Sequence, residues 1–150
     1  MARCNYPIDV KKHKYLAKAI KVPCGKCPPC KKRRVDSWVF RLQQEDKRSI
    51  ASKFITLTYD TLHVPISKNG FMTLHKPDWQ KFMKRLRKNS PDHQIKYYAV
   101  GEYGEKRQRP HYHAIIFNVQ DDKLYEQSWN LYDHKTKSKI PIGTVDVQRS

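Results

Sequence analysis

The sequence predicts an α+β domain in which an antiparallel sheet carries helices on one face, in the ferredoxin-like or RRM-like order strand, helix, strand, strand, helix, strand. Residues 54–59 alternate β-branched and aromatic side chains, as a half-buried strand does. Between Trp79 and Leu86, large apolar side chains recur at the spacing that gives a helix one apolar stripe. The short polar segment 104–109 separates two strand-like segments, which we therefore expect to form an antiparallel hairpin.

An additional helix is expected in front of this order, from Val35 to about Arg48, because Val35, Trp38, Val39 and Leu42 recur at helical spacing. The next expected elements are a strand at 54–59, a loop ending in the turn dipeptide Asn69-Gly70, and a helix from Pro77 to Asn89 that buries Trp79, Phe82, Met83 and Leu86. After these we expect strands at 95–100 and 111–119, a helix capped by Asp121 and Asp122 that carries Tyr125, Trp129 and Tyr132, a Lys-rich loop, and a strand at 143–147.

The charge of the chain indicates a polyanionic partner. Its 150 residues include 31 Lys and Arg against 14 Asp and Glu, for a formal net charge of +17. So much positive charge on one domain repels itself unless a polyanion is present, and nucleic acid is the natural candidate. A membrane surface is the weaker alternative, because the sequence has no apolar run of spanning length and no lipidation motif. No secretory signal is visible, so we expect a cytosolic compartment in which thiols stay reduced.

Residues 1–34 are interpreted as a basic, Cys-rich arm outside the core. Cys24, Cys27 and Cys30 have the close spacing of thiolate metal ligands, and Cys4 or His13 would complete a tetrahedral zinc site. The alternative is a reduced arm that is stiffened by proline and binds no metal.

The candidate chemistry lies in a pair of histidines. His111 and His113 are two residues apart on an expected strand, so both side chains leave the same face of the sheet. Antiparallel pairing would bring Glu102 beside them as a carboxylate ligand. Two imidazoles and one carboxylate leave coordination positions open, which suits Mg²⁺ or Mn²⁺ acting on a phosphate. The alternative is a pair of surface histidines without a metal.

Several basic residues are expected to contact phosphates without sequence preference. They are Lys31, Lys32, Arg33, Arg34, Lys84, Arg85, Arg87, Lys88, Arg107 and Arg109. The alternative for such clusters is a solvated helix end that is favourable to the helix dipole. Tyr97, Tyr103 and Tyr112 are candidates for stacking on unpaired bases, although alternation turns Tyr112 away from the histidines and favours packing in the core.

Four segments together resemble a known family. They are residues 54–59, 99–104, 109–114 and 24–31. In this combination the chain is similar to the HUH (His-hydrophobe-His) nucleases that start rolling-circle replication, and among them to the replication initiators of gokushovirus-like microviruses, which are small single-stranded DNA phages. The resemblance covers residues 24–147.

The resemblance implies an HUH endonuclease fold over residues 35–150, with Glu102, His111 and His113 as ligands of Mg²⁺ or Mn²⁺. It also implies a tyrosine that attacks a phosphodiester of single-stranded or origin DNA, and action in the cytoplasm of a host cell together with host replication proteins. In the family this tyrosine lies on a helix after the last strand, which would fall beyond Ser150. We therefore expect residues 1–150 to bind metal and DNA but to nick poorly, with Tyr125 and Tyr132 as weak candidates for the nucleophile. The alternative function is a basic DNA- or RNA-binding module without nuclease activity.

Overall fold

The computed structural model describes residues 3–10, 19–90 and 94–149. The chain divides into two compact units, residues 1–47 and 48–150, which are described one at a time. In the described part of the chain, none of the helices combines the length and the apolar character needed to cross a membrane.

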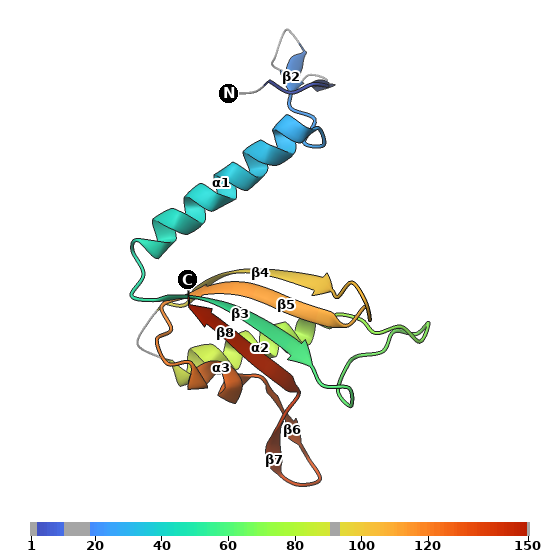
Figure 1. The fold of residues 1–150 in the computed structure, drawn as a ribbon, viewed down its shortest axis with the longest axis vertical. Coiled ribbons are helices and arrows are strands. Elements are labelled where there is room, and N and C mark those ends of the chain that lie inside the picture. The colour runs from blue at the N-terminus through green and yellow to red at the C-terminus, as the bar shows by residue number, and fades with distance from the viewer. Residues whose placement is uncertain (1–2, 11–18, 91–93, 150) are drawn as a thin grey trace. The chain divides into compact units, whose positions relative to one another are not determined.

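The second unit is built on a four-stranded antiparallel sheet with the strand order β4-β5-β3-β8 (Figure 1). The strands are β3 (Ser52–Tyr59), β4 (Lys96–Tyr103), β5 (Pro110–Phe117) and β8 (Gly143–Arg149). All pairings within this sheet are antiparallel. The α+β class and the β4–β5 hairpin are thus confirmed. β5 and β3 are the central strands, whereas β4 lies at an edge.

Two helices, α2 (Lys76–Asn89) and α3 (Lys123–Ser128), pack against one face of this sheet (Figure 1). The expected stripe of α2 is confirmed, because Trp79, Phe82, Met83 and Leu86 are all buried. They meet the buried side chains of β3 and β5, which alternate with partly exposed ones on the opposite face. Burial of each large apolar side chain contributes about 1.5–3 kcal/mol. The sheet therefore has one face in the core and one open face.

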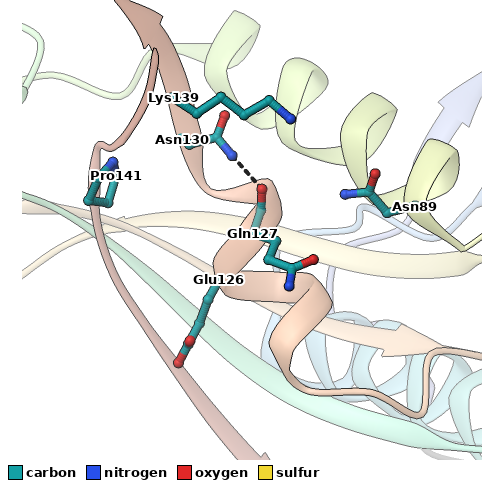
Figure 2. A pocket seen from close by; sticks show the side chains of 6 residues that line it. All are labelled: Asn89, Glu126, Gln127, Asn130, Lys139 and Pro141. Atoms are coloured by element: carbon teal, nitrogen blue, oxygen red, sulfur yellow. Dashed lines mark hydrogen bonds between the residues drawn. The ribbon is translucent and has the colours of Figure 1, made fainter.

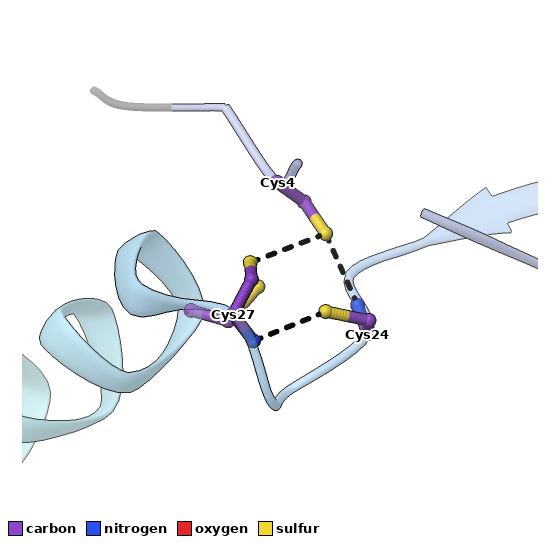
Figure 3. Close-up of side chains that lie close together, drawn as sticks. Cys4, Cys24 and Cys27 are labelled. Carbon is purple, nitrogen blue, oxygen red and sulfur yellow. Dashed lines mark hydrogen bonds between the residues drawn. The ribbon is translucent and has the colours of Figure 1, made fainter. Parts of the chain in front are cut away.

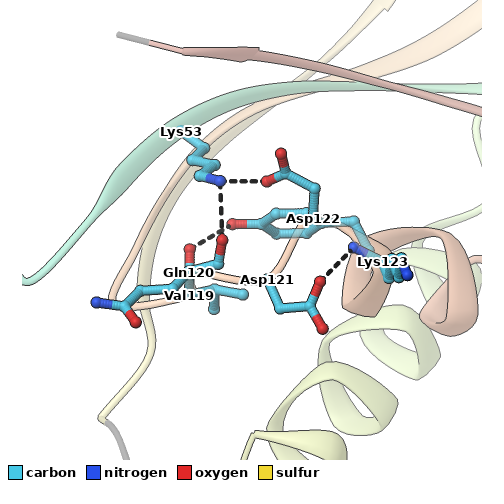
Figure 4. A network of polar contacts seen from close by, with 7 residues as sticks. Lys53, Val119, Gln120, Asp121, Asp122 and Lys123 are labelled. Carbon is cyan, nitrogen blue, oxygen red and sulfur yellow. Dashed lines mark hydrogen bonds and ion pairs between the residues drawn. The ribbon is translucent and has the colours of Figure 1, made fainter.

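The connection from β5 to α3 is held by Lys53 of β3 (Figure 4). The ammonium group of Lys53 donates a hydrogen bond to the carbonyl of Gln120 at 2.9 Å and forms an ion pair with Asp122. At the start of α3, the Asp121 carboxylate accepts a hydrogen bond from the Lys123 N–H at 3.0 Å. Of the two aspartates expected to cap this helix, Asp121 therefore makes the bond to the backbone, and Asp122 instead binds the lysine.

A hairpin replaces the rest of the expected helix and the Lys-rich loop. It consists of β6 (Asn130–Asp133) and β7 (Ser138–Pro141). The placement of Tyr132 on a helix was therefore wrong, because this residue lies on β6. The carboxylate of Asp133 accepts hydrogen bonds from the Lys135 N–H at 3.0 Å and the Thr136 hydroxyl at 2.8 Å, which closes the turn. Such local bonds compete successfully with a longer α3.

The first unit contains a short antiparallel hairpin and one helix. β1 (Ile8–Val10) pairs with β2 (Ile20–Val22), and α1 spans Pro28–Asp46. The helix thus begins at Pro28 rather than Val35, so the expected boundary after residue 34 falls inside α1. Proline in the first turn explains the early start, since its fixed φ suits that position and no N–H is lost there. The compact units divide after Lys47.

Candidate functional site

The histidine pair lies on the open face of the sheet. In the pairing of β4 with β5, Glu102 stands opposite His111, and in that of β3 with β5, Thr58 stands opposite His111 and Thr56 opposite His113. Residues that pair directly across neighbouring strands project from the same face. The ring centroids of the two histidines are 6.1 Å apart. The structure therefore brings together the three residues that the sequence suggested as ligands.

Two threonines orient the imidazole rings. The Thr58 hydroxyl lies 3.1 Å from Nδ1 of His111, and the Thr56 hydroxyl lies 3.0 Å from Nδ1 of His113. With Nδ1 engaged in this way, Nε2 of each ring is the nitrogen left to bind an ion. Neither threonine was singled out from the sequence. Their signal was present in the alternation of residues 54–59, which places them on the face opposite the apolar residues of the same strand.

The donor atoms fit a divalent cation in part. Nε2 of His113 lies 3.3 Å from Oε2 of Glu102, close to the separation of about 3 Å between neighbouring ligands of an octahedral ion with bonds of about 2.1 Å. A side chain on Gly104 would come within 3.1 Å of Nε2 of His111, so the glycine keeps this nitrogen accessible. Among the described residues, Glu102, His111 and His113 are not a group whose donor atoms all lie within 4.8 Å of one another. The Glu102 side chain is 62% exposed and has room to move toward an ion.

The electrostatic surroundings keep one imidazole neutral. Burial lowers the pKa of His111 below its usual value, and the nearby charges of His113 and Arg109 act in the same direction, whereas Glu102 opposes them. A neutral imidazole has the lone pair that a metal ion requires.

A hollow lined in part by Thr58, Arg109, Gly143 and Thr144 adjoins this cluster. The Arg109 guanidinium donates hydrogen bonds to the carbonyl of Tyr59 at 2.8 Å and to the hydroxyl of Thr61 at 3.0 Å. Arg109 therefore holds the end of β3 in place and carries a fixed positive charge beside the hollow.

The other basic residues do not gather at the histidines. Lys84, Arg87 and Lys88 are exposed on α2, across the sheet from the open face. Arg85 donates Nε to the carbonyl of Ser128 at 2.8 Å, and burial lowers its pKa, so it ties α2 to α3. Arg107 is exposed in the β4–β5 turn. The residues Lys31, Lys32, Arg33 and Arg34 are exposed on α1, in the first unit.

The aromatic residues divide between the two faces. Tyr112 is 7% exposed and packs in the core, which confirms the expectation from alternation. Tyr97 and Tyr103 project from the helix side, where the ring centroid of Tyr97 is 5.4 Å from that of Trp79. On the open face are instead Tyr98, which is 36% exposed, and Phe54, which stacks on His113 at 5.7 Å. These two were not singled out from the sequence.

The two candidate tyrosines differ in accessibility. Tyr125 is fully buried with its hydroxyl 3.5 Å from the carbonyl of Val119, and burial raises its pKa. Neither property suits a nucleophile. Tyr132 is 51% exposed on β6, with its ring 5.1 Å from that of His134.

A separate hollow lies where α2, α3 and the β6–β7 hairpin meet (Figure 2). The side chains lining it are Asn89, Glu126, Gln127, Asn130, Lys139 and Pro141. The amide of Asn130 donates a hydrogen bond to the carbonyl of Gln127 and closes part of its wall. It contains none of the residues that the sequence suggested for function.

The four cysteines form a second cluster, in the first unit. Their Sγ atoms all lie within 4.8 Å of one another, so Cys4, rather than His13, stands with the other three; His13 lies outside the described residues. A hydrogen bond with the backbone of Asn5 lowers the pKa of Cys27 to about 6, and burial raises the pKa of Cys30 to about 11.

The fold and the site together define a basic α+β protein with a histidine and carboxylate cluster on the open face of an antiparallel sheet. Residues 52–150 match the family described as replication-associated protein ORF2. The chain belongs to this family, and the match lies within the second unit. The recognition of a phage replication protein from the sequence is thereby confirmed.

Three curated relatives are replication-associated proteins of phages or viruses. The chain is 34% identical to VP4 of Bdellovibrio phage phiMH2K over 83% of its own length and 44% of that protein. It is 38% identical to ORF2 of Spiroplasma virus 4 over 69% of its length and 33% of the relative, and 32% identical to ORF4 of Chlamydia phage 1 over 86% and 34%. The chain therefore spans less than half the length of these relatives. No solved structure matches it.

Proposed function

We propose that this chain is the DNA- and metal-binding part of an HUH-type initiator of rolling-circle replication, acting in a phage-infected host cell. The observation that carries the proposal is the histidine pair on the open face, with Glu102 on the adjacent strand. The order β3, α2, β4, β5, α3, β8 and the sheet order β4-β5-β3-β8 support a ferredoxin-like HUH fold.

His111, His113 and Glu102 would hold Mg²⁺ or Mn²⁺, with the threonine hydroxyls fixing the two rings. When bound, the ion would polarise a phosphodiester and offset the charge that develops on its oxygens. The chain itself supplies orientation and a further positive charge, since Arg109 is held beside the hollow that adjoins His111. In the nicking reaction a tyrosine oxygen would bond to phosphorus while the 3′-oxygen of the broken strand departs.

The orienting role of the threonines leads to a specific expectation. Replacing Thr58 with valine preserves the shape of the side chain but removes the hydroxyl that binds Nδ1 of His111. We expect the Kd for Mn²⁺, measured by titration calorimetry, to rise by about 10- to 100-fold. Thr144→Val is the matched control, because Thr144 pairs with Thr58 on the same face and is exposed. Equal Kd values for the two variants would show that the hydroxyl has no such role.

The alternative function is a basic nucleic-acid-binding module whose histidines are incidental. The formal charge of +17 supports DNA binding by either protein. The exposed side chain of Glu102 also fits either alternative. Only the metal dependence of DNA binding separates the two.

Binding of a fluorescent single-stranded oligonucleotide, followed by anisotropy, tests the proposal. Mn²⁺ should raise the affinity of the wild-type chain, because open positions on the ion accept phosphate oxygens, and His113→Ala should lose this increase. On the same face, Tyr98→Ala should weaken binding by about 5- to 150-fold, as expected for the loss of one stacked base. Tyr97→Ala is the control, since Tyr97 projects from the helix side. If Mn²⁺ has no effect and the two tyrosine variants bind alike, the basic-module alternative is correct.

Cleavage is scored in the same reactions. Little nicking is expected from residues 1–150. Efficient, Mn²⁺-dependent nicking would contradict that expectation and would direct attention to Tyr132, since Tyr125 is buried.

A further inference from the structure

Four thiols meet in the first unit from three separate stretches of chain (Figure 3). Cys4 precedes β1, Cys24 follows β2, and Cys27 and Cys30 lie at the start of α1. The four Sγ atoms lie within 4.8 Å of one another, and those of Cys4 and Cys27 are 3.8 Å apart. In a tetrahedron of thiolates around Zn²⁺ with bonds of about 2.3 Å, neighbouring sulfur atoms are about 3.8 Å apart. The spacing therefore suits one ion.

Backbone N–H groups point at these sulfur atoms. The N–H of Cys24 donates to Sγ of Cys4 at 3.3 Å, and the N–H of Cys27 donates to Sγ of Cys24 at 3.4 Å. Such bonds favour the negatively charged thiolate. Gly25 makes the turn between Cys24 and Cys27 possible, because its φ of +72° lies in the left-handed region.

The surrounding charge is also favourable. Four thiolates around one Zn²⁺ carry a net negative charge, which the positive N-terminal end of α1 partly offsets. Cys27 caps this helix and Cys30 lies in its first turn. The guanidinium of Arg34 reaches the same turn, 3.4 Å from where a Cβ on Gly25 would lie.

Apart from the cysteines, the described part of the first unit has little core. Its buried apolar residues are Cys27 and Cys30, at 5% and 6% exposure, whereas Ile8, Val10 and Ile20 of the hairpin are about half exposed. A unit of this size without a hydrophobic core commonly depends on a metal or disulfides.

We propose that Cys4, Cys24, Cys27 and Cys30 bind one Zn²⁺ as a structural site that holds the β1–β2 hairpin to the start of α1. The ion fixes the first turns of α1 and with them the basic residues Lys31 to Arg34. A multinuclear iron–sulfur cluster would hold its thiolates farther apart than this group allows. The site lies outside residues 52–150, so its presence is independent of the function proposed for the sheet.

The test uses the whole chain, expressed with zinc and purified under reducing conditions. Elemental analysis should find about one zinc per chain, and Cys24→Ser and Cys30→Ser should each lower this severalfold. His111→Ala/His113→Ala is the control and should keep its zinc, which separates this site from the one on the sheet. Less than about a tenth of an equivalent in the wild-type chain, or full zinc in both cysteine variants, would overturn the proposal.

A second measurement does not depend on the variants folding. Metal-free wild-type chain titrated with Co²⁺ should develop the intense visible bands of tetrahedral thiolate coordination, saturating at one equivalent, and Zn²⁺ should displace them. Saturation without these bands, or disulfides among the four cysteines in freshly purified protein, would also overturn the proposal.

Discussion

Mn²⁺ is expected to raise the Tm of the wild-type chain and to leave that of His111→Ala unchanged. An ion that binds only the folded state adds about 2.7 kcal/mol to the free energy of unfolding at a concentration one hundred times its Kd. Without His111, one imidazole and one carboxylate remain in the cluster, and such a pair binds the ion far more weakly. Differential scanning fluorimetry on zinc-loaded protein measures the effect without involving the cysteines.

Two further variants sharpen this measurement. Glu102→Gln keeps a weaker oxygen ligand and should retain part of the rise in Tm, whereas the control His134→Ala should retain all of it, since His134 lies on the exposed β6–β7 turn. An undiminished rise in His111→Ala would exclude the metal site on the sheet.

The same rise should depend on pH, because only neutral imidazoles bind the ion. Burial lowers the pKa of His111, so in the folded chain it stays neutral to a lower pH than in the unfolded chain. Its contribution to the free energy of unfolding is complete above the unfolded histidine pKa of about 6.5 and is lost as the pH falls through the lower folded value. The rise in Tm should fade over the same acidic range.

Gly143→Ala is expected to destabilise the second unit by about 3 kcal/mol or more. A Cβ at this position would overlap the carbonyl oxygen of Thr58 and lie 2.9 Å from the amide nitrogen of Asp60. Both are backbone atoms in or beside the β3–β8 pairing, so no side-chain rotation relieves the clash. We expect the start of β8 to separate from β3 and the Tm to fall by more than about 10 °C.

Thr144→Ala is the control for this experiment, because Thr144 is the next residue along β8 and its side chain is exposed. It should change the Tm by a small fraction of that amount. A Gly143→Ala variant as stable as the wild-type chain would mean that β8 does not approach β3 as closely as described. The variant should also bind Mn²⁺ more weakly, since Thr58 orients His111.

Periodicity predicted most of the second unit correctly. The alternation at residues 54–59 and the stripe from Trp79 to Leu86 depend on which side chains are buried, and burial in one layer leaves a direct trace in sequence. The β6–β7 hairpin was missed because its turn depends on hydrogen bonds of the Asp133 side chain, which apolar periodicity does not record. α1 was started too late because its first turn carries cysteines and basic residues rather than an apolar stripe.

The candidate site was predictable where strand geometry alone determines it. Two residues of alternation place His111 and His113 on one face, and a short hairpin places Glu102 beside them. Thr56 and Thr58 were not predicted, because pairing of β3 with β5 joins residues more than fifty positions apart. The basic residues of α2 were grouped with the site by charge, but the sequence does not tell which side of the sheet a helix covers.

The three expected ligands differ in how firmly the backbone holds them. β5 is bonded on both sides, by β4 and β3, whereas β4 is the outermost strand of its sheet. The histidines thus stand on the stiffest part of the scaffold, and the carboxylate stands on a border that opens at lower free energy. We expect an ion to enter and leave by displacement of Glu102 while both rings stay in place, so that exchange of the ion requires no disturbance of the central strands.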